Sequence, residues 1–147
     1  MAANINAIYP ATPYAVTASL AAVTACTTRA PTVTASLAAA NIVAFVPVST
    51  NGLRIDKIQV QACSSSFTAA TAAQTVTIWM WDGTTAYVID EILVTLVTPS
   101  TTVAAFNTSK TYTNLVLPAT FALYMSTSIT TTASTTALSV SAFGGAY

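Results

Sequence analysis

Alternating apolar and polar positions are clearest between Thr75 and Trp81, and they predict a β-strand. Successive side chains of a strand point to opposite faces, so this segment has one apolar face and one face that mixes Thr with Trp. The first face holds Val76, Ile78 and Met80, and the second holds Thr77, Trp79 and Trp81. Asp82 and Gly83 follow, a pair that favours a hairpin turn because Gly accepts positive φ without penalty. The pattern then predicts a second long strand from Ala86 to Val97.

Further strands are predicted where Val, Ile and Thr recur, because β-branched residues pack well on a pleated surface. They run from Leu53 to Cys63, from Thr111 to Leu117, from Phe121 to Ser128 and from Thr136 to Phe143. The stretch from Ser64 to Ala73 is small and polar and is expected to be a loop, and Gly144 and Gly145 are expected to loosen the C-terminus. Short strands separated by turns predict an all-β fold, an antiparallel β-sandwich.

The first third of the chain has a different pattern. The heptad Val16-Thr17-Ala18-Ser19-Leu20-Ala21-Ala22 recurs at residues 33–39. Its apolar spacing also fits a helical face, but Thr beside Val favours a strand. We therefore expect a single domain over residues 1–147, in which residues 1–14 form an extended arm and residues 51–147 the main sandwich. Residues 15–50 supply either the first strands or a segment that bridges subunits.

Charge is nearly absent, and this excludes several classes of function. Only 5% of the 147 residues are charged, against about 25% in an ordinary domain, and the chain has no His. High hydrophobicity with zero net charge argues against disorder, and scattered Arg and Lys residues argue against nucleic-acid binding. Without His no Ser-His or Cys-His pair can be built, and adjacent Asp90 and Glu91 should point to opposite faces of a strand. We therefore expect no enzyme.

No cofactor, metal or membrane span is expected either. Cys26 and Cys63 fit no zinc motif, although they could form a disulfide if the fold brings them together. No apolar run reaches 18 residues, and the N-terminus lacks the features of a secretory signal.

Three aromatic residues are the candidate contact residues. Trp79 and Trp81 share a strand face, and Tyr87 is expected near them across the hairpin. If exposed, they would stack on a sugar or anchor a protein partner. The alternative is that they fill the core or a subunit interface, since large aromatic side chains are usually buried.

Several short motifs, in the same order along the chain, resemble a group of small proteins of tailed phages and prophages. They include Leu53-Arg54-Ile55-Asp56-Lys57-Ile58, Trp79-Met80-Trp81-Asp82-Gly83-Thr84-Thr85, Asp90-Glu91-Ile92-Leu93-Val94, Leu115-Val116-Leu117-Pro118-Ala119, Leu123-Tyr124-Met125-Ser126-Thr127 and Val140-Ser141-Ala142-Phe143-Gly144-Gly145. The chain departs from the group at Thr120, where Gly is usual, and at Ala146, where an acidic residue is usual. The resemblance implies a jelly-roll β-sandwich that is a structural part of the virion, and it carries no catalytic residues.

The leading hypothesis is a capsid decoration, or cement, protein. It would form a homotrimer, clamp neighbouring subunits of the major capsid protein through uncharged surfaces, and reside in the virion after synthesis in the host cytoplasm. The alternatives are a head-fibre or tail module that binds a host glycan through Trp79 and Trp81, and a self-assembling coat or filament subunit. Because residues 1–28 and 111–147 carry no charge, we expect the two chain ends to supply most of the contact between subunits.

Overall fold

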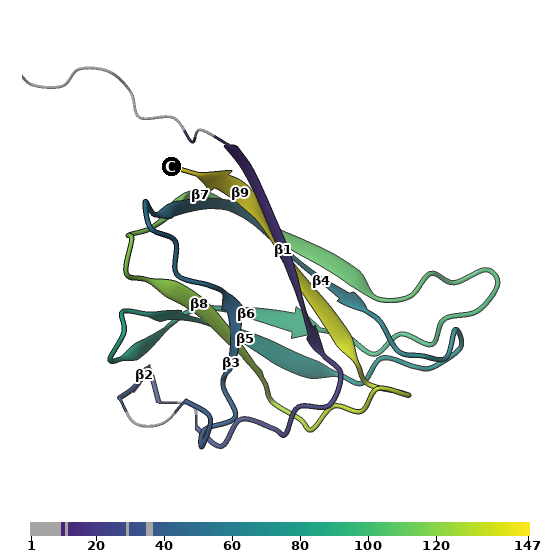
Figure 1. Cartoon of the computed structure of the whole chain (residues 1–147). Coiled ribbons are helices and arrows are strands. Elements are labelled where there is room, and N and C mark those ends of the chain that lie inside the picture. Colours follow the sequence, from purple (N-terminus) through teal and green to yellow (C-terminus); the bar gives the residue numbers. More distant parts are fainter. Residues whose placement is uncertain (1–9, 11, 29, 35–36) are drawn as a thin grey trace, which may run out of the picture.

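The chain folds into two antiparallel β-sheets that pack face to face (Figure 1). The structure is a computed structural model that describes residues 10, 12–28, 30–34 and 37–147. No helix occurs among these residues. The predicted all-β, antiparallel sandwich is therefore confirmed.

Strands that are distant in sequence lie side by side in both sheets. The first sheet has the order β1-β9-β4-β7, and the second has the order β2-β6-β5-β8-β3. The strands of the first sheet are β1 (Thr12–Leu20), β4 (Leu53–Ala62), β7 (Asn107–Leu117) and β9 (Leu138–Ala146). Those of the second are β2 (Thr32–Val33), β3 (Val43–Val46), β5 (Gln74–Trp81), β6 (Ala86–Val94) and β8 (Ala122–Thr127).

Strand β5 has the two faces that its alternation predicts. Val76 and Ile78 are fully buried in the main core between the sheets. Trp79 is buried on the other face of the sheet, in a second cluster with Ile42 and Ala86. The segment 37–42 therefore covers part of the outer surface of the second sheet.

Several predicted boundaries differ from the structure. Strand β7 begins at Asn107 rather than Thr111, and β6 ends at Val94 rather than Val97. Strands β1, β2 and β3 lie in the first third of the chain and belong to both sheets, so the sandwich is not confined to residues 51–147. Most of the expected arm, residues 1–9 and 11, lies outside the described residues, but Thr12–Tyr14 belong to β1 rather than to an arm.

The two copies of the repeated heptad adopt different structures. In the first copy, residues 16–20 are part of β1, where they alternate between half-buried and exposed positions before the buried Leu20. In the second copy, Val33 ends β2, and residues 37–39 belong to a turn. Partners elsewhere in the fold, rather than the heptad itself, therefore decide its conformation.

The last strand lies in the middle of a sheet and is held closely on both sides. Strand β9 pairs with β1 from Leu20↔Leu138 to Thr12↔Ala146, and with β4 on its other edge. A Cβ at Gly144 would overlap the backbone carbonyl oxygen of Arg54, and one at Gly145 would overlap the ring of Pro10. The expectation that the Gly pair loosens the C-terminus was wrong, because both glycines permit close packing within β9.

We predict that Gly144→Ala destabilises the fold by about 1–3 kcal/mol, the usual range for overpacking a well-packed site. The added methyl group collides with backbone, which cannot rotate away as a side chain would. For a domain of this size each kcal/mol lowers Tm by about 2–4 °C. Thermal and urea unfolding measure the effect, and Ser139→Ala on the same strand is the control. A Gly144→Ala variant as stable as the wild type would contradict the close packing described here.

Candidate functional site

Four segments without a charged residue gather at one end of the sandwich. They follow β1 (residues 21–28) and connect β4 to β5 (63–73), β6 to β7 (95–106) and β8 to β9 (128–137). Backbone hydrogen bonds join them, from Ser65 N–H to the Ala133 carbonyl and from Thr131 N–H to the Val23 carbonyl. We call these four segments the uncharged loop end.

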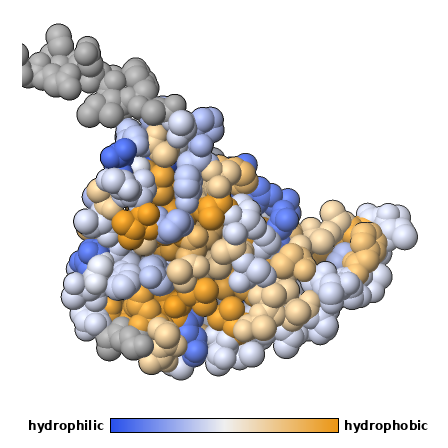
Figure 2. Space-filling model, in the orientation of Figure 1, coloured by the Kyte–Doolittle hydropathy of each residue, from blue (hydrophilic) through white to orange (hydrophobic). Residues whose placement is uncertain are grey.

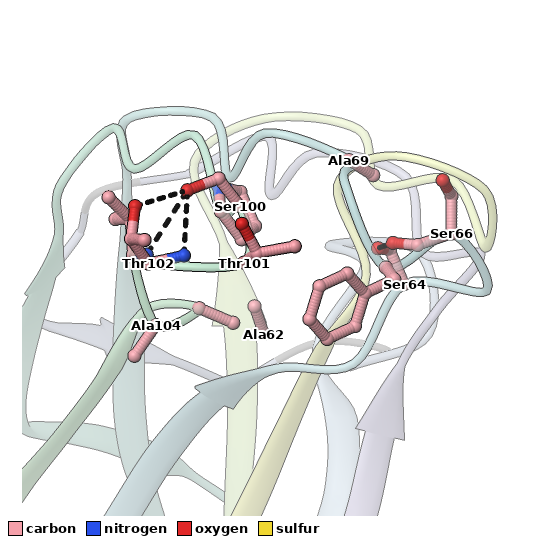
Figure 3. A pocket seen from close by; sticks show the side chains of 12 residues that line it. Ala62, Ser64, Ser66, Ala69, Ser100, Thr101, Thr102 and Ala104 are labelled. Atoms are coloured by element: carbon pink, nitrogen blue, oxygen red, sulfur yellow. Dashed lines mark hydrogen bonds between the residues drawn. The ribbon is translucent and has the colours of Figure 1, made fainter.

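A cleft of about 480 Å³ opens between the 63–73 and 95–106 loops. Figure 3 shows Ala62 at its floor, Ser64, Ser66 and Ala69 along one wall and Ser100, Thr101, Thr102 and Ala104 along the other. Methyl and hydroxyl groups dominate these walls. The cleft therefore suits an uncharged partner surface and offers no acid or base for catalysis.

The two loops are fixed at their bases by backbone hydrogen bonds. Ala62 N–H donates to the Phe106 carbonyl at 2.9 Å, and Thr71 N–H donates to the Val97 carbonyl at 2.8 Å. At the tip of the second loop, the Ser100 hydroxyl oxygen accepts from Thr102 N–H at 3.2 Å and from Val103 N–H at 3.1 Å. Ser is common at such turns because its side chain can replace a backbone acceptor. The cleft walls are thus ordered by their own hydrogen bonds.

Large apolar side chains project from these loops into solvent. Phe67 is 76% exposed, Leu96 is 65% exposed and Val103 is 47% exposed. Phe67 and Val103 also line the cleft, from opposite walls. In Figure 2 the part of the uncharged loop end that projects to the right carries hydrophobic and weakly polar colours rather than deep blue. Exposed apolar side chains that gather in one region of a folded protein make that region a candidate binding surface.

Sequence reasoning predicted the 64–73 loop but missed this surface. Each apolar residue stands alone among Ser, Thr and Ala, so no local pattern singles it out. The available signal was Phe67 within a charge-free loop, since a lone large aromatic gains nothing from exposure to water.

Most charged side chains of the described residues lie outside the loop end and have a partner, but Glu91 lines a small pocket together with Thr28. Arg54 forms a two-pronged ion pair with Asp56, at 2.8 Å and 3.0 Å. The ammonium group of Lys57 lies 4.6 Å from the ring centroid of Phe143, as a cation–π contact. These groups occupy the outer face of the first sheet.

A polar cluster links the two sheets at one side of the sandwich. The Asp90 carboxylate on β6 accepts hydrogen bonds from Lys110 and, at 2.7 Å, from the Tyr112 hydroxyl, both on β7. Burial opposes ionisation of Asp90, but these donors and the Glu91 N–H outweigh it and lower its pKa. Burial, together with Asp90, raises the pKa of Tyr112. The prediction that Asp90 and Glu91 point to opposite faces of the strand also agrees with the structure. The Asp90 side chain is 10% exposed, whereas Glu91 is exposed.

The structure separates the three aromatic candidates. Trp79 is 1% exposed, and its indole N–H donates to the buried hydroxyl of Ser126 at 2.9 Å. Trp81 is half-buried and makes an edge-to-face contact with Tyr124, with ring centroids 5.2 Å apart. Trp81 and Tyr124 line a second cavity of about 540 Å³ with Gly83 and Thr84.

Tyr87 lies on the other face of the sheet from both Trp residues. It is paired with Met80, and directly paired residues share a face. Its hydroxyl donates to Asp82 at 3.2 Å, in the turn between β5 and β6. Asp82 also accepts from Thr85 N–H and Thr84 N–H, and these bonds lower its pKa. The expectation that Tyr87 joins Trp79 and Trp81 in one contact surface was wrong, because the strand register places it opposite them.

Other candidate chemistry is limited. Cys26 and Cys63 are free thiols, and burial raises the pKa of Cys63. Within the described part of the chain, no three His, Cys, Asp or Glu side chains are grouped so that they could hold a metal ion. Nor do the described residues include a helix of the length and apolar character needed to cross a membrane.

We predict that Asp90→Asn lowers the free energy of unfolding by about 1–2 kcal/mol at pH 7, because it removes a charged acceptor shared by Lys110 and Tyr112. The pKa of Asp90 is lowered in the folded state, so its stabilisation is present above the ordinary Asp pKa of about 3.9 and is lost as pH falls through the lowered value. Urea unfolding across this range should therefore show the wild type and the variant converging in acid. Exposed Glu91→Gln is the control, and an equal deficit at every pH would contradict the assignment.

Comparison of the chain with protein-family models, with curated proteins and with solved structures gave no match.

Proposed function

We propose that this chain is a virion structural protein, most consistent with a capsid decoration protein that binds subunits of the major capsid protein through its uncharged loop end. The observation that carries the proposal is the exposure of Phe67, Leu96 and Val103 on ordered loops without charge. Burying such side chains against a partner is favourable by about 25 cal/mol per Å² of apolar surface. No charge in these loops has to be desolvated on docking, a step that usually costs several kcal/mol per ion.

The topology supports a jelly-roll assignment, which the resemblance to phage proteins implies. Strand pairs are nested: β1 with β9, β3 with β8, β4 with β7 and β5 with β6. Such nesting arises when one long antiparallel hairpin is rolled into two sheets, as in jelly rolls of viral capsid domains. The short β2 is an addition at the edge of the second sheet.

The first test is whether the protein is present in purified virions. We expect it to co-purify with intact particles through a density gradient. Its absence from purified virions would rule out a structural role in the particle.

The second test asks whether the loop end is the docking surface. We predict that Phe67→Ser weakens binding of the purified protein to undecorated capsids about tenfold to hundredfold, since burying one Phe side chain contributes about 1.5–3 kcal/mol. Val48→Ser is the matched control, because Val48 is 57% exposed but lies in the connection between β3 and β4, at the opposite end of the sandwich. Equal binding by both variants would place the docking surface elsewhere.

The alternative is a head-fibre or tail module that binds a host glycan, and one observation favours it. Trp81 and Tyr124 line an open cavity beside Gly83 and Thr84, and aromatic rings in such cavities can stack on sugars. Trp79 is buried and cannot contact a ligand, so of the two Trp residues only Trp81 could stack on a sugar. Glycan-array binding that Trp81→Ala abolishes, together with unaffected thermal stability, would favour this alternative over capsid decoration.

A further inference from the structure

Strand β1 leaves one long edge of the first sheet without a partner among the described residues. It is nine residues long and pairs only with β9. Its register with β9 is unbroken from Thr12 to Leu20, so the strand carries no bulge. At about 3.3 Å per residue, the free edge is about 30 Å long.

This edge lacks the devices with which proteins prevent unwanted strand pairing. Such devices are charged side chains, bulges, prolines and very short edge strands. Strand β1 has no charged residue, and its only proline, Pro13, stands next to its first residue. The stretch Tyr14–Leu20 therefore presents an uninterrupted row of backbone donors and acceptors.

Every other edge in the described residues is protected. Strand β7 carries Lys110, has a register shift against β4, and places Asn114 at a φ of 65°. Strand β6 carries Asp90 and Glu91 along the part that β2 does not cover. Strands β2 and β3 are two and four residues long. The contrast indicates that pairing at β1 has not been prevented as it has elsewhere.

We propose that β1 pairs antiparallel with β1 of a second copy of this chain, which joins two four-stranded sheets into one continuous sheet. A second copy fits because the edge is self-complementary: neither side brings a charge, so no like charges meet across the two-fold axis. Antiparallel pairing is also a closed arrangement, since it uses the one unprotected edge of each copy. The protected strand β7 then stands at both ends of the joint sheet.

The side chains on the inward face of β1 also favour a second copy of β1 as the partner strand. Tyr14, Val16 and Ala18 face the core but are only half-buried by their own chain, because the opposing edge strand β3 is four residues long. A second β1 with its own inward apolar residues would extend the apolar layer beside them. Pairing therefore adds apolar burial to the backbone hydrogen bonds.

The antiparallel arrangement has a consequence that rests on the proposed function. The two uncharged loop ends would point in opposite directions along the joint sheet. One dimer could then contact two neighbouring capsid subunits. The oligomer inferred here is a dimer, in place of the trimer expected from the sequence.

The test uses the purified full chain and two matched variants. Thr17 and Ser109 occupy the same row of the outer face, on β1 and β7 respectively, linked through Ser141 and Gln59. Both side chains are exposed and leave room for Lys, although Lys at position 17 gives up the hydrogen bond between the Thr17 and Ser141 hydroxyls. We expect sedimentation velocity to give twice the 15.1 kDa chain mass for the wild type and for Ser109→Lys. Thr17→Lys should dissociate at a concentration at least about tenfold higher, because it brings positive charge to both sides of the new pairing.

Hydrogen exchange on the wild type provides a second measurement that needs no variant. Amides within Tyr14–Leu20 should become more protected as concentration rises through the dimer dissociation constant, while amides of β7 should not change. A monomeric wild type at high micromolar concentration, a trimer, open-ended filaments, or equal dissociation of the two Lys variants would overturn the proposal. None of these results depends on capsid binding, so a failed dimer and a failed docking surface are distinguished.

Discussion

The sandwich depends on the placement of its last strand between its first and its fourth. Strand β9 contributes Leu138, Val140 and Ala142 to the core and pairs along both edges. It can lie so close to β4 only because Gly144 has no side chain beside the Arg54 carbonyl. Without β9, strand β1 would have no partner in its sheet. The fold is therefore completed by contacts between the two ends of the described chain, which are slow to find because they are distant in sequence.

The placement of β9 also changes how the low charge of the chain is interpreted. The uncharged C-terminal stretch needs no partner to explain it, since the inward side of β9 is buried in the chain's own core. The uncharged N-terminal stretch is different, because β1 is covered on one edge only. Charge is also missing from loops that the fold collects at one end. Absence of charge thus falls in three distinct places in the described part of the molecule: a core strand, a free strand edge and an exposed loop surface.

The local parts of the fold were predictable from sequence, and the spatial ones were not. The faces of β5 follow from strict alternation, and the turn at Asp82 and Gly83 follows from turn chemistry, which Gly83 satisfies with a φ of 101°. The position of Tyr87 was not predictable, because the turn sets a register in which Tyr87 pairs with Met80 rather than with a Trp. Phe67 and Val103 are 36 positions apart in sequence (103 − 67), and only the connections between the sheets bring them to one cleft. The repeated heptad shows the limit most directly, since identical residues form part of a strand once and part of a turn the second time.

The few charged side chains lie mostly apart from the two surfaces proposed for assembly. The Asp90 cluster holds β6 and β7 together and at the same time keeps charge on the edges where extra strands would otherwise add. Arg54, Asp56 and Lys57 keep the outer face of the first sheet hydrated at the end remote from the uncharged loops. A chain with so little charge would be expected to associate through any uncovered surface. Charge is retained at β6, β7 and the β4 face, and it is missing from the two surfaces proposed for association, the edge of β1 and the uncharged loop end.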